Sequence, residues 1–303
     1  MKDIETIGLI GLGALGMLFS NCFVKSGKRF VVIADAERAE RIRRDGAIIN
    51  GEHVCFEVRT PEEGTPLDLV IFATKAGGLS SAMETAAPFV GETTCILSVL
   101  NGISSEEELE RRFGKEEVLL CTAQGMDAVR EGNRLSYAHP GTLVIGERAP
   151  GKVSERAGAL AEFLTAAGIP TEAVPDMVRR QWGKLMLNVG INQTVMVYEG
   201  TYRTVQQPGE ARETMLSAMR EVLTLANLEG FALTEHDLNQ WVALADTLAP
   251  EGMPSMRQDA MAHRKSEVEL FAGTVIRLAK THGLDVPVNE MLYRRIREME
   301  SMY

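Results

Sequence analysis

A glycine-spaced turn near the start of the chain constrains its fold more than any other feature. The apolar segment TIGLIGLGALG (6–16) ends in Gly11-x-Gly13-x-x-Gly16, and a helix-like run, MLFSNCFVKSG (17–27), follows it. In such a strand–turn–helix unit the first glycine permits the tight turn and the second lets the backbone approach a pyrophosphate. The third lets the helix pack on the strand. A pyrophosphate then lies at the helix N-terminus, where free N–H groups and the helix dipole favour negative charge. The segment therefore predicts a dinucleotide-binding turn.

An acidic residue follows at the expected distance. A second apolar strand, RFVVIAD, ends at Asp35, nineteen residues beyond Gly16. An acid at this position normally hydrogen-bonds the ribose 2′-hydroxyl of NAD, whereas the 2′-phosphate of NADP would meet like charge. We therefore expect a dinucleotide to contact both the turn and the acid, through Gly11, Leu12, Gly13, Ala14, Leu15, Gly16 and Asp35.

The rest of the first half alternates between apolar strands and helices, which is typical of a parallel sheet. Strands are expected within 47–50, 55–60, 67–75, 93–102 and 117–125, and helices within 36–46 and 104–114, the latter with capping serines. In NRLSYAHPGTLVIGE (133–147) we expect two antiparallel strands joined through Pro140-Gly141. Ligands of such sheets bind beyond the carboxyl ends of the strands. Lys75 and Asn101 end two of the strands, so both are candidates for cofactor contact.

Strand signals stop near Pro175, and long helices are expected over about 176–197, 208–229, 235–246, 255–282 and 288–300. With 303 residues and 45% hydrophobic content, the chain can bury two cores. We therefore predict an α/β protein in which an N-terminal Rossmann domain with a doubly wound parallel sheet (1–174) precedes an all-helical domain (175–303).

Two segments of the helical half carry polar residues that call for an explanation. In KLMLNVGIN, the residues Lys184, Asn188 and Asn192 follow one another at steps of four, so they form one polar stripe on an otherwise apolar helix. We expect this polar stripe to line the cleft between the two predicted domains rather than to face water. In PSMRQDAMAHRKSEVEL (254–270), Ser255 and Gln258 fit a capping box, and Glu267 lies three turns further on.

Bulk composition excludes several classes of function. A net charge of -10 makes nucleic acid an unsuitable partner, because phosphate binding needs a basic surface. Nineteen uncharged residues (6–24) approach the length of a membrane span, but their glycines fit the turn better, and neither a basic start nor a cleavage site accompanies them. The four cysteines have neither CxxC nor metal-ligand spacing. We expect a cytoplasmic protein with reduced thiols, no metal and no membrane partner.

With these residues in place, the chain resembles the ketopantoate reductase (2-dehydropantoate 2-reductase) family over essentially its full length. The resemblance rests on GLGALG, on TKA and NG after two of the strands, on KLMLNVGIN, and on PSMRQD followed by SEVE. It implies a Rossmann domain followed by a helical domain, and reduction of ketopantoate to pantoate on the path to pantothenate and coenzyme A. It also implies NADPH as the usual cofactor.

The resemblance also assigns roles to individual residues. Lys184 is the implied catalytic proton donor, and Glu267 is implied to work near it and near the cofactor. Asn188, Asn192 and Ser255 are implied to hold the substrate, while Lys75 and Asn101 contact the cofactor or bridge it to the substrate. These residue types suit the reaction. A lysine stabilises and protonates the oxygen on which charge develops, and neutral amides and hydroxyls bind a carboxylate without changing the charge balance.

Three positions depart from the family pattern. Gln193 stands where a proline or small residue is usual, and Tyr202 stands about where a substrate-binding asparagine is often found. These two leave a related 2-oxo acid open as substrate. Asp35 stands where many relatives carry an arginine for the 2′-phosphate, which leaves NAD(H) open beside NADP(H).

Other classes of protein compete with this interpretation. A β-hydroxyacid dehydrogenase also joins a Rossmann domain to helices, but its Lys-x-x-Asn spacing differs from the Lys-x3-Asn-x3-Asn found here. A non-catalytic nucleotide-sensing protein would have little reason to keep Lys184 in an apolar helix. The sequence does not fix the oligomeric state, and we allow for a homodimer.

Overall fold

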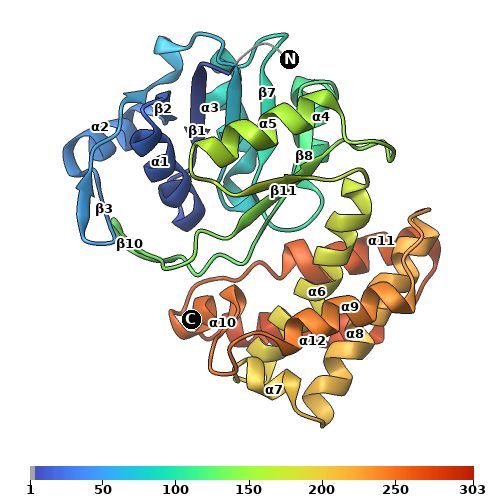
Figure 1. The fold of residues 1–303 in the computed structure, drawn as a ribbon. Coiled ribbons are helices and arrows are strands. Elements are labelled where there is room, and N and C mark those ends of the chain that lie inside the picture. Colours follow the sequence, from blue (N-terminus) through green and yellow to red (C-terminus); the bar gives the residue numbers. More distant parts are fainter. Residues whose placement is uncertain (1–3) are drawn as a thin grey trace. The chain divides into compact units, whose positions relative to one another are not determined.

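The structure, a computed structural model, describes residues 4–303. The chain divides into two compact units, Met1–Val178 and Arg179–Tyr303. The first is an α/β unit and the second consists of helices (Figure 1). The predicted fold class is confirmed.

An eight-stranded sheet organises the first unit. Its strands in spatial order are β12 (Thr171–Ala173), β11 (Thr142–Gly146), β8 (Val118–Gln124), β7 (Cys95–Ser98), β6 (Leu69–Phe72), β1 (Thr6–Ile10), β2 (Arg29–Ile33) and β5 (Val58–Arg59). The run from β8 to β5 is parallel throughout, while β11 pairs with β8 in the antiparallel sense. Strands β1, β6 and β7 are almost entirely buried, as continuous apolar runs predict for a sheet covered on both faces.

Helices cover both faces of this sheet (Figure 1). The helices of the unit are α1 (Ala14–Ser26), α2 (Ala36–Asp45), α3 (Leu79–Ala86), α4 (Ser105–Phe113) and α5 (Glu155–Ala166), with short 3-10 turns at Pro61–Glu63, Ala76–Gly78 and Ala87–Phe89. Side chains of α1 and α5 pack in one core with alternate strand residues such as Leu9 and Ile71. Side chains of α3 and α4 pack in a second core with the intervening residues, such as Ile10 and Phe72. Successive side chains along each strand thus point alternately into two separate cores.

A smaller sheet corrects one prediction. It orders β4 (Glu52–Val54), β3 (Ala47–Ile49), β10 (Arg134–Ser136) and β9 (Val129–Glu131). The expected hairpin within 133–147 is wrong, because β10 pairs with β9 and β3 while β11 pairs with β8 in the main sheet. The segment between β10 and β11 is anchored to Asn50, which follows β3. The Asn50 side chain accepts from the Tyr137 backbone N–H at 2.9 Å and donates to its carbonyl at 3.0 Å.

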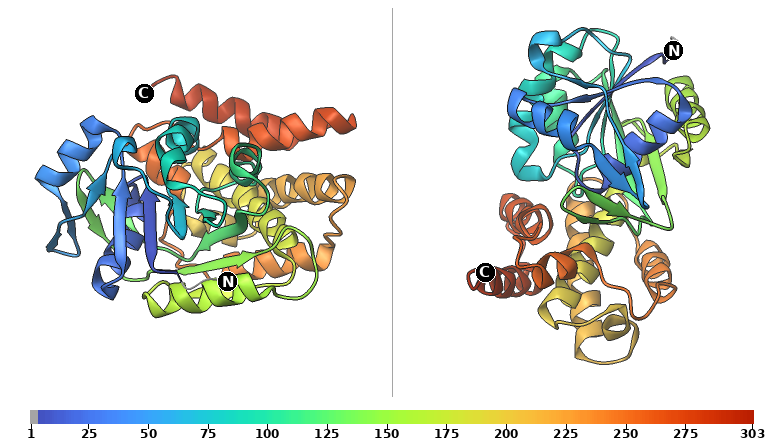
Figure 2. Two further views of the ribbon diagram at one scale, coloured as in Figure 1. Left: turned by 90° about the horizontal axis from the view of Figure 1, so that it is seen from above. Right: turned by 90° about the vertical axis from the view of Figure 1, so that its left-hand side faces the viewer.

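The second unit is built from helices, as both views of Figure 2 show. They are α6 (Met177–Val197), which begins just before the boundary, α7 (Tyr202–Gln206), α8 (Glu210–Leu228), α9 (Glu235–Asp246), α10 (Ser255–Met261), the π-helix η4 (Glu269–Gly273), α11 (Thr274–His282) and α12 (Pro287–Glu300). Four of the five expected helices are present, and α7 was not expected.

The single helix expected over 255–282 is wrong. The chain leaves helical geometry after Met261, and His263 has a φ of 50°. One local contact and one tertiary contact hold the break. The backbone N–H of Arg264 donates to the Asp259 carbonyl at 2.9 Å, and Ser266 donates from both its N–H and its hydroxyl to Glu300. The two bonds to Glu300 are long-range, and they replace helical bonds that the local sequence would otherwise favour.

No helix within residues 4–303 combines the length and the apolar character that crossing a membrane requires.

Candidate active site

The glycine turn has the geometry that each glycine was expected to provide. Gly11 has a φ of 101°, and a β-carbon there would lie 2.7 Å from the backbone of Ala73 and Thr74 on the neighbouring strand end. A β-carbon on Gly16 would lie 1.8 Å from the Gly11 carbonyl oxygen. Both positions therefore exclude any side chain. Gly13 differs, because a β-carbon there would meet only the Ala73 carbonyl, at an ordinary 3.7 Å. The protein itself does not need a glycine at this position, whereas a ligand approaching the backbone does.

The surroundings of the turn also fit a dinucleotide. Residues 11–15 are partly exposed while the next turn of α1 is buried, so the start of the helix is open to a ligand. Gly13 occupies the N-cap position without any side-chain cap, which leaves first-turn N–H groups for an anion. The buried hydroxyl of Thr74 has no hydrogen-bond partner within residues 4–303. The first-turn N–H groups of α1 and the Thr74 hydroxyl therefore lie where a pyrophosphate would bind.

Asp35 follows β2 and has a structural role of its own. It is the N-cap of α2, where its Oδ1 accepts from the Arg38 backbone N–H at 2.8 Å. Its Oδ2 accepts from Arg38 Nη1 at 2.9 Å. Both side chains remain well exposed. The acid of the fingerprint and the nearest arginine are therefore one ion pair at the end of the second strand.

Lys75 and Asn101 follow two adjacent strands, β6 and β7. Lys75 is exposed and precedes the 3-10 turn Ala76–Gly78, while Asn101 is partly exposed and precedes Gly102, whose φ is 89°. Because β1 lies beside β6, the residues that follow β1, β6 and β7 share the carboxyl edge of the sheet. The structure thus places Gly11, Lys75 and Asn101 along one edge.

A buried glutamate near this edge was not singled out by the sequence. Glu106 lies in the first turn of α4, is 1% exposed, and accepts from the Ser105 hydroxyl at 2.7 Å. Burial raises the pKa of its carboxyl to about 7, although hydrogen bonds oppose that shift. The predicted serine cap is absent, since the Ser104 side chain makes no cap hydrogen bond. The run of three glutamates in the sequence gave no sign of which one would be buried.

The polar stripe lies on α6. Lys184 and Asn192 are each 9% exposed and Asn188 is partly exposed, so this is not a solvated face. Glycines fix the opposite side of the helix. A β-carbon on Gly183 would lie 2.2 Å from Trp241 of α9, and one on Gly190 would lie 2.5 Å from Met219 of α8. The close packing of α8 and α9 sets the rotation of α6, and with it the direction of the polar stripe.

Ser255 and Glu267 do not share one helix. Ser255 is the exposed first residue of α10, whose N-cap is Pro254, and the expected capping box is wrong. Gln258 instead donates to the Met253 carbonyl at 3.0 Å. Glu267 is partly exposed and lies in the irregular segment before η4. Contacts within the second unit nevertheless tie both segments to α6 or to the turn that follows it. Arg257 lies 3.8 Å from Glu199, two residues after α6, and Ala272 donates to Gln193 of α6 at 3.0 Å.

Tyr202 packs against the loop that leads to Ser255. Its backbone N–H donates to the Gly252 carbonyl at 2.9 Å. Its ring edge would lie 3.1 Å from a β-carbon on Gly252, so this loop position has little room for a side chain. Burial raises the pKa of the Tyr202 phenol. An aromatic ring thus stands beside the segment that carries a candidate substrate residue.

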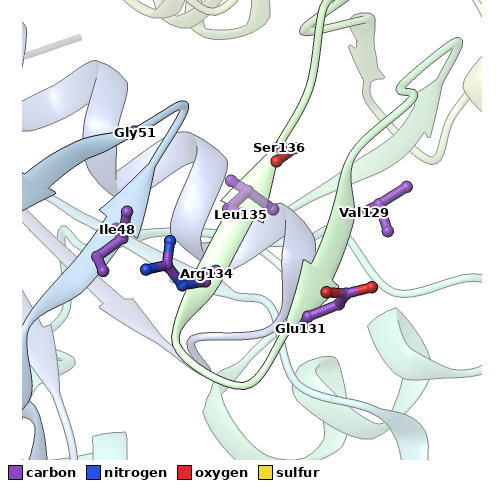
Figure 3. A pocket seen from close by; sticks show the side chains of 7 residues that line it. All are labelled: Ile48, Gly51, Val129, Glu131, Arg134, Leu135 and Ser136. Atoms are coloured by element: carbon purple, nitrogen blue, oxygen red, sulfur yellow. The ribbon is translucent and has the colours of Figure 1, made fainter.

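Two surface hollows lie in the first unit. One, of about 190 Å³, is lined by the small sheet at Ile48, Gly51, Val129, Glu131, Arg134, Leu135 and Ser136 (Figure 3). The other, of about 340 Å³, lies between α1 and the end of α5. Neither is lined by a residue of the predicted site. Among residues 4–303, no three His, Cys, Asp or Glu side chains are grouped so that they could hold a metal ion.

A Rossmann unit with this glycine turn, followed by a helical unit, defines the class of nicotinamide-dependent oxidoreductases with two domains. Residues 7–150 match the family model described as Ketopantoate reductase PanE/ApbA, and residues 176–300 match Ketopantoate reductase PanE/ApbA C terminal. The chain therefore belongs to the ketopantoate reductase family, and the predicted resemblance is confirmed.

Individual relatives span the whole chain. A 2-dehydropantoate 2-reductase from Aquifex aeolicus is 25% identical, with 96% of each chain covered. The crystal structure of a 2-dehydropantoate 2-reductase from Geobacter metallireducens is 26% identical, with a TM-score of 0.84 and coverage of 97% of this chain and 99% of that one. A D-mandelate dehydrogenase, solved with NADH and anilino(oxo)acetate, shares the fold with a TM-score of 0.87 at 22% identity, covering 98% of this chain and 99% of its own.

Proposed function

We propose that this protein reduces ketopantoate to pantoate with a nicotinamide cofactor. The observation that carries the proposal is Lys184, which lies 9% exposed at the head of the polar stripe. A lysine is costly to bury in an otherwise apolar helix, so its presence there points to a functional role. Family membership over both units and the names of full-length relatives at 25–26% identity agree with this reaction.

The proposed chemistry assigns a distinct task to each residue of the second unit. The cofactor, when bound, supplies a hydride to the 2-oxo carbon. Lys184 stabilises the charge that develops on the oxo oxygen and delivers a proton to it. Asn188, Asn192 and Ser255 hydrogen-bond the substrate carboxylate and hydroxyl. Glu267 orients the ammonium group of Lys184.

The first unit binds the dinucleotide. The turn from Gly11 to Gly16 binds the pyrophosphate at the start of α1, which the open N-terminus and the small Gly13 allow. Lys75 and Asn101, at the same sheet edge, bind the cofactor nearer its reactive end. Asp35 takes the ribose 2′-hydroxyl, and for this reason we infer that NADH is the better cofactor.

A related 2-oxo acid is the second candidate substrate. Tyr202 favours it, because its half-buried ring stands beside the loop to Ser255, where the family often has an asparagine that binds substrate. An aromatic ring suits an apolar substrate side chain better than a hydroxylated one.

One assay separates these candidates. NADH and NADPH oxidation is followed with ketopantoate and with 2-oxo acids that carry aliphatic or aromatic side chains. The proposal requires that ketopantoate give the highest kcat/KM. A higher value for an aromatic 2-oxo acid selects the second candidate, and no turnover of any 2-oxo acid rejects a reductase. The oligomeric state stays a prediction, to be measured by light scattering on the same sample.

A further inference from the structure

Gln193 is a fully buried amide that lies directly beside Asn192 on α6. Its Nε2 donates to the Val189 carbonyl at 2.9 Å, within the same helix. The same nitrogen lies 3.4 Å from Asn289 Oδ1 on α12. Its Oε1 accepts the backbone N–H of Ala272, in η4, at 3.0 Å. One side chain thus joins the helix of the polar stripe to two other elements.

The orientation of this amide is fixed by a second anchor. Asn289 donates from Nδ2 to Glu221 at 2.7 Å and to the Ala218 carbonyl at 3.3 Å, so its Oδ1 is the end that faces Gln193. Glu221 also accepts the backbone N–H of Asn289 at 2.9 Å. Because the facing atom is an acceptor, Gln193 must present its NH₂ group there. Its oxygen is thereby directed to the N–H of Ala272.

The bond from Ala272 compensates for an irregularity in η4. Gly273 donates back five residues to the Val268 carbonyl at 3.0 Å, which is the wide step of a π-turn. The same step would direct the Ala272 N–H to the Glu267 carbonyl, to which Leu270 donates at 2.9 Å. The Ala272 N–H goes instead to Gln193. A buried N–H needs a partner, so the wide turn depends on this side chain.

We propose that Gln193 is a positioning residue, which holds η4 against α6 and so fixes where Glu267 stands relative to the polar stripe. Glu267 is the residue at which the segment leading into η4 begins, and its backbone carbonyl accepts the first bond of that segment. Without the Gln193 side chain, the wide turn can change to regular helical hydrogen bonding, and this change would move Glu267. The role in catalysis rests on the proposed function of Glu267 and Lys184, whereas the hold on η4 does not.

The test compares Gln193→Met, which keeps length and volume but removes both polar ends, with two other variants. Gln193→Glu keeps an acceptor for the Ala272 N–H, and its protonated carboxyl also keeps a donor for the Val189 carbonyl. Thr194→Val is the matched control, because Thr194 is the next residue on α6, is fully buried, and its hydroxyl has no partner within residues 4–303. Amide hydrogen exchange is measured across 267–273, together with kcat, KM and cofactor affinity.

We expect Gln193→Met to speed exchange in 267–273 and to lower kcat about tenfold to a hundredfold, the usual effect of a small misplacement of a catalytic group. Cofactor affinity should change much less than kcat, because Gln193 lies in the second unit and the glycine turn in the first. Gln193→Glu should recover most of the protection at a pH low enough to keep its buried carboxyl protonated, and Thr194→Val should behave as wild type. If Gln193→Met does not fold, Gln193→Asn withdraws the same acceptor by one methylene.

Unchanged exchange in 267–273, or a kcat no lower than that of Thr194→Val, would overturn the proposal. Failure of the proposed function is seen separately, since wild-type protein would then turn over no 2-oxo acid. The exchange data do not depend on turnover, so they decide the hold on η4 in either case.

Discussion

Gly16 lies so close to Gly11 that a β-carbon on Gly16 would stand 1.8 Å from the Gly11 carbonyl oxygen. At Gly13, between them, a β-carbon would stand 3.7 Å from its nearest neighbour. The glycines of one motif therefore have different reasons to be glycine. At Gly16 the reason is packing of the helix on the turn, and at Gly13 it is access to the backbone.

Alanine substitution should separate these two reasons. Gly16→Ala should destabilise the first unit by about 1–3 kcal/mol, the usual cost of overpacking, and weaken dinucleotide binding as a consequence. Gly13→Ala should leave the unfolding midpoint unchanged and still weaken dinucleotide binding. Thermal unfolding and NADH fluorescence titration measure both quantities. Equal loss of stability in the two variants would contradict this division of roles.

Lys184→Ala should lower kcat by about 10²–10⁴-fold, which is the usual contribution of a positioned general acid. Cofactor affinity should stay as in wild type, because the glycine turn lies in the first unit and Lys184 in the second. Steady-state kinetics with ketopantoate and fluorescence titration with NADH provide the two measurements. A folded variant that turns over within a few-fold of wild type would remove Lys184 from the mechanism.

Ser255→Ala and Asn192→Ala should raise the substrate KM and leave cofactor affinity unchanged. Ser255→Ala also tests the structure of α10. Ser255 makes no cap hydrogen bond there, so its loss should not cost the roughly 1 kcal/mol that a true N-cap contributes. A variant that loses cofactor affinity but keeps its substrate KM would contradict the assignment of substrate binding to the second unit.

Local sequence patterns predicted those elements whose stability is set locally. Helix α9 (Glu235–Asp246) coincides with the predicted range, and its start is fixed locally by a capping box of Thr234 and Asp237. Strands β1, β6 and β7 read as continuous apolar runs, since both sheet faces are covered. The glycine turn was predictable because the backbone at Gly11 and Gly16 admits no side chain.

Elements set by distant partners were not predictable from local pattern. No glycine or proline interrupts 255–272, and the break after Met261 comes from bonds to Glu300 and Gln193, which lie far away in the sequence. The two strands within 133–147 likewise pair in different sheets, β10 with β3 in the small sheet and β11 with β8 in the main sheet. At the candidate site, the sequence named the residues, but only the structure shows that Asp35 pairs with Arg38 and that Glu106 is buried.

Asp35→Asn should narrow the preference for NADH. The wild type should show the higher kcat/KM with NADH, because a carboxylate binds the 2′-hydroxyl and repels a 2′-phosphate. Asparagine still caps α2 well, so stability should be kept. The substitution also releases Arg38 from its ion pair, which should improve use of NADPH.

The ratio of kcat/KM for the two cofactors in both proteins is the measurement, and Arg38→Ala is the control. A wild type that prefers NADPH by tenfold or more, and loses that preference in Arg38→Ala, would identify Arg38 as the phosphate ligand and overturn the argument from Asp35.

Glu106 should make the stability of the protein depend on pH between about 4.5 and 7. Burial raises the pKa of its carboxyl from 4.5 to about 7 in the folded chain. Below the lower value both states are protonated, and the contribution to stability is fully present. Between the two values the unfolded chain loses its proton while the folded chain keeps it, so stability falls as pH rises, by about 3 kcal/mol over the whole interval.

Glu106→Gln should remove this slope, because an amide stays neutral at every pH and can still bond the Ser105 hydroxyl. The variant should therefore be more stable than wild type at pH 8 and close to it at pH 4. Glu107→Gln is the matched control, since Glu107 is the next residue of α4 and is exposed. Urea unfolding from pH 4 to 8 measures all three proteins. If Glu106→Gln keeps the wild-type slope, the pH dependence arises elsewhere and Glu106 is ionised in the folded protein at neutral pH.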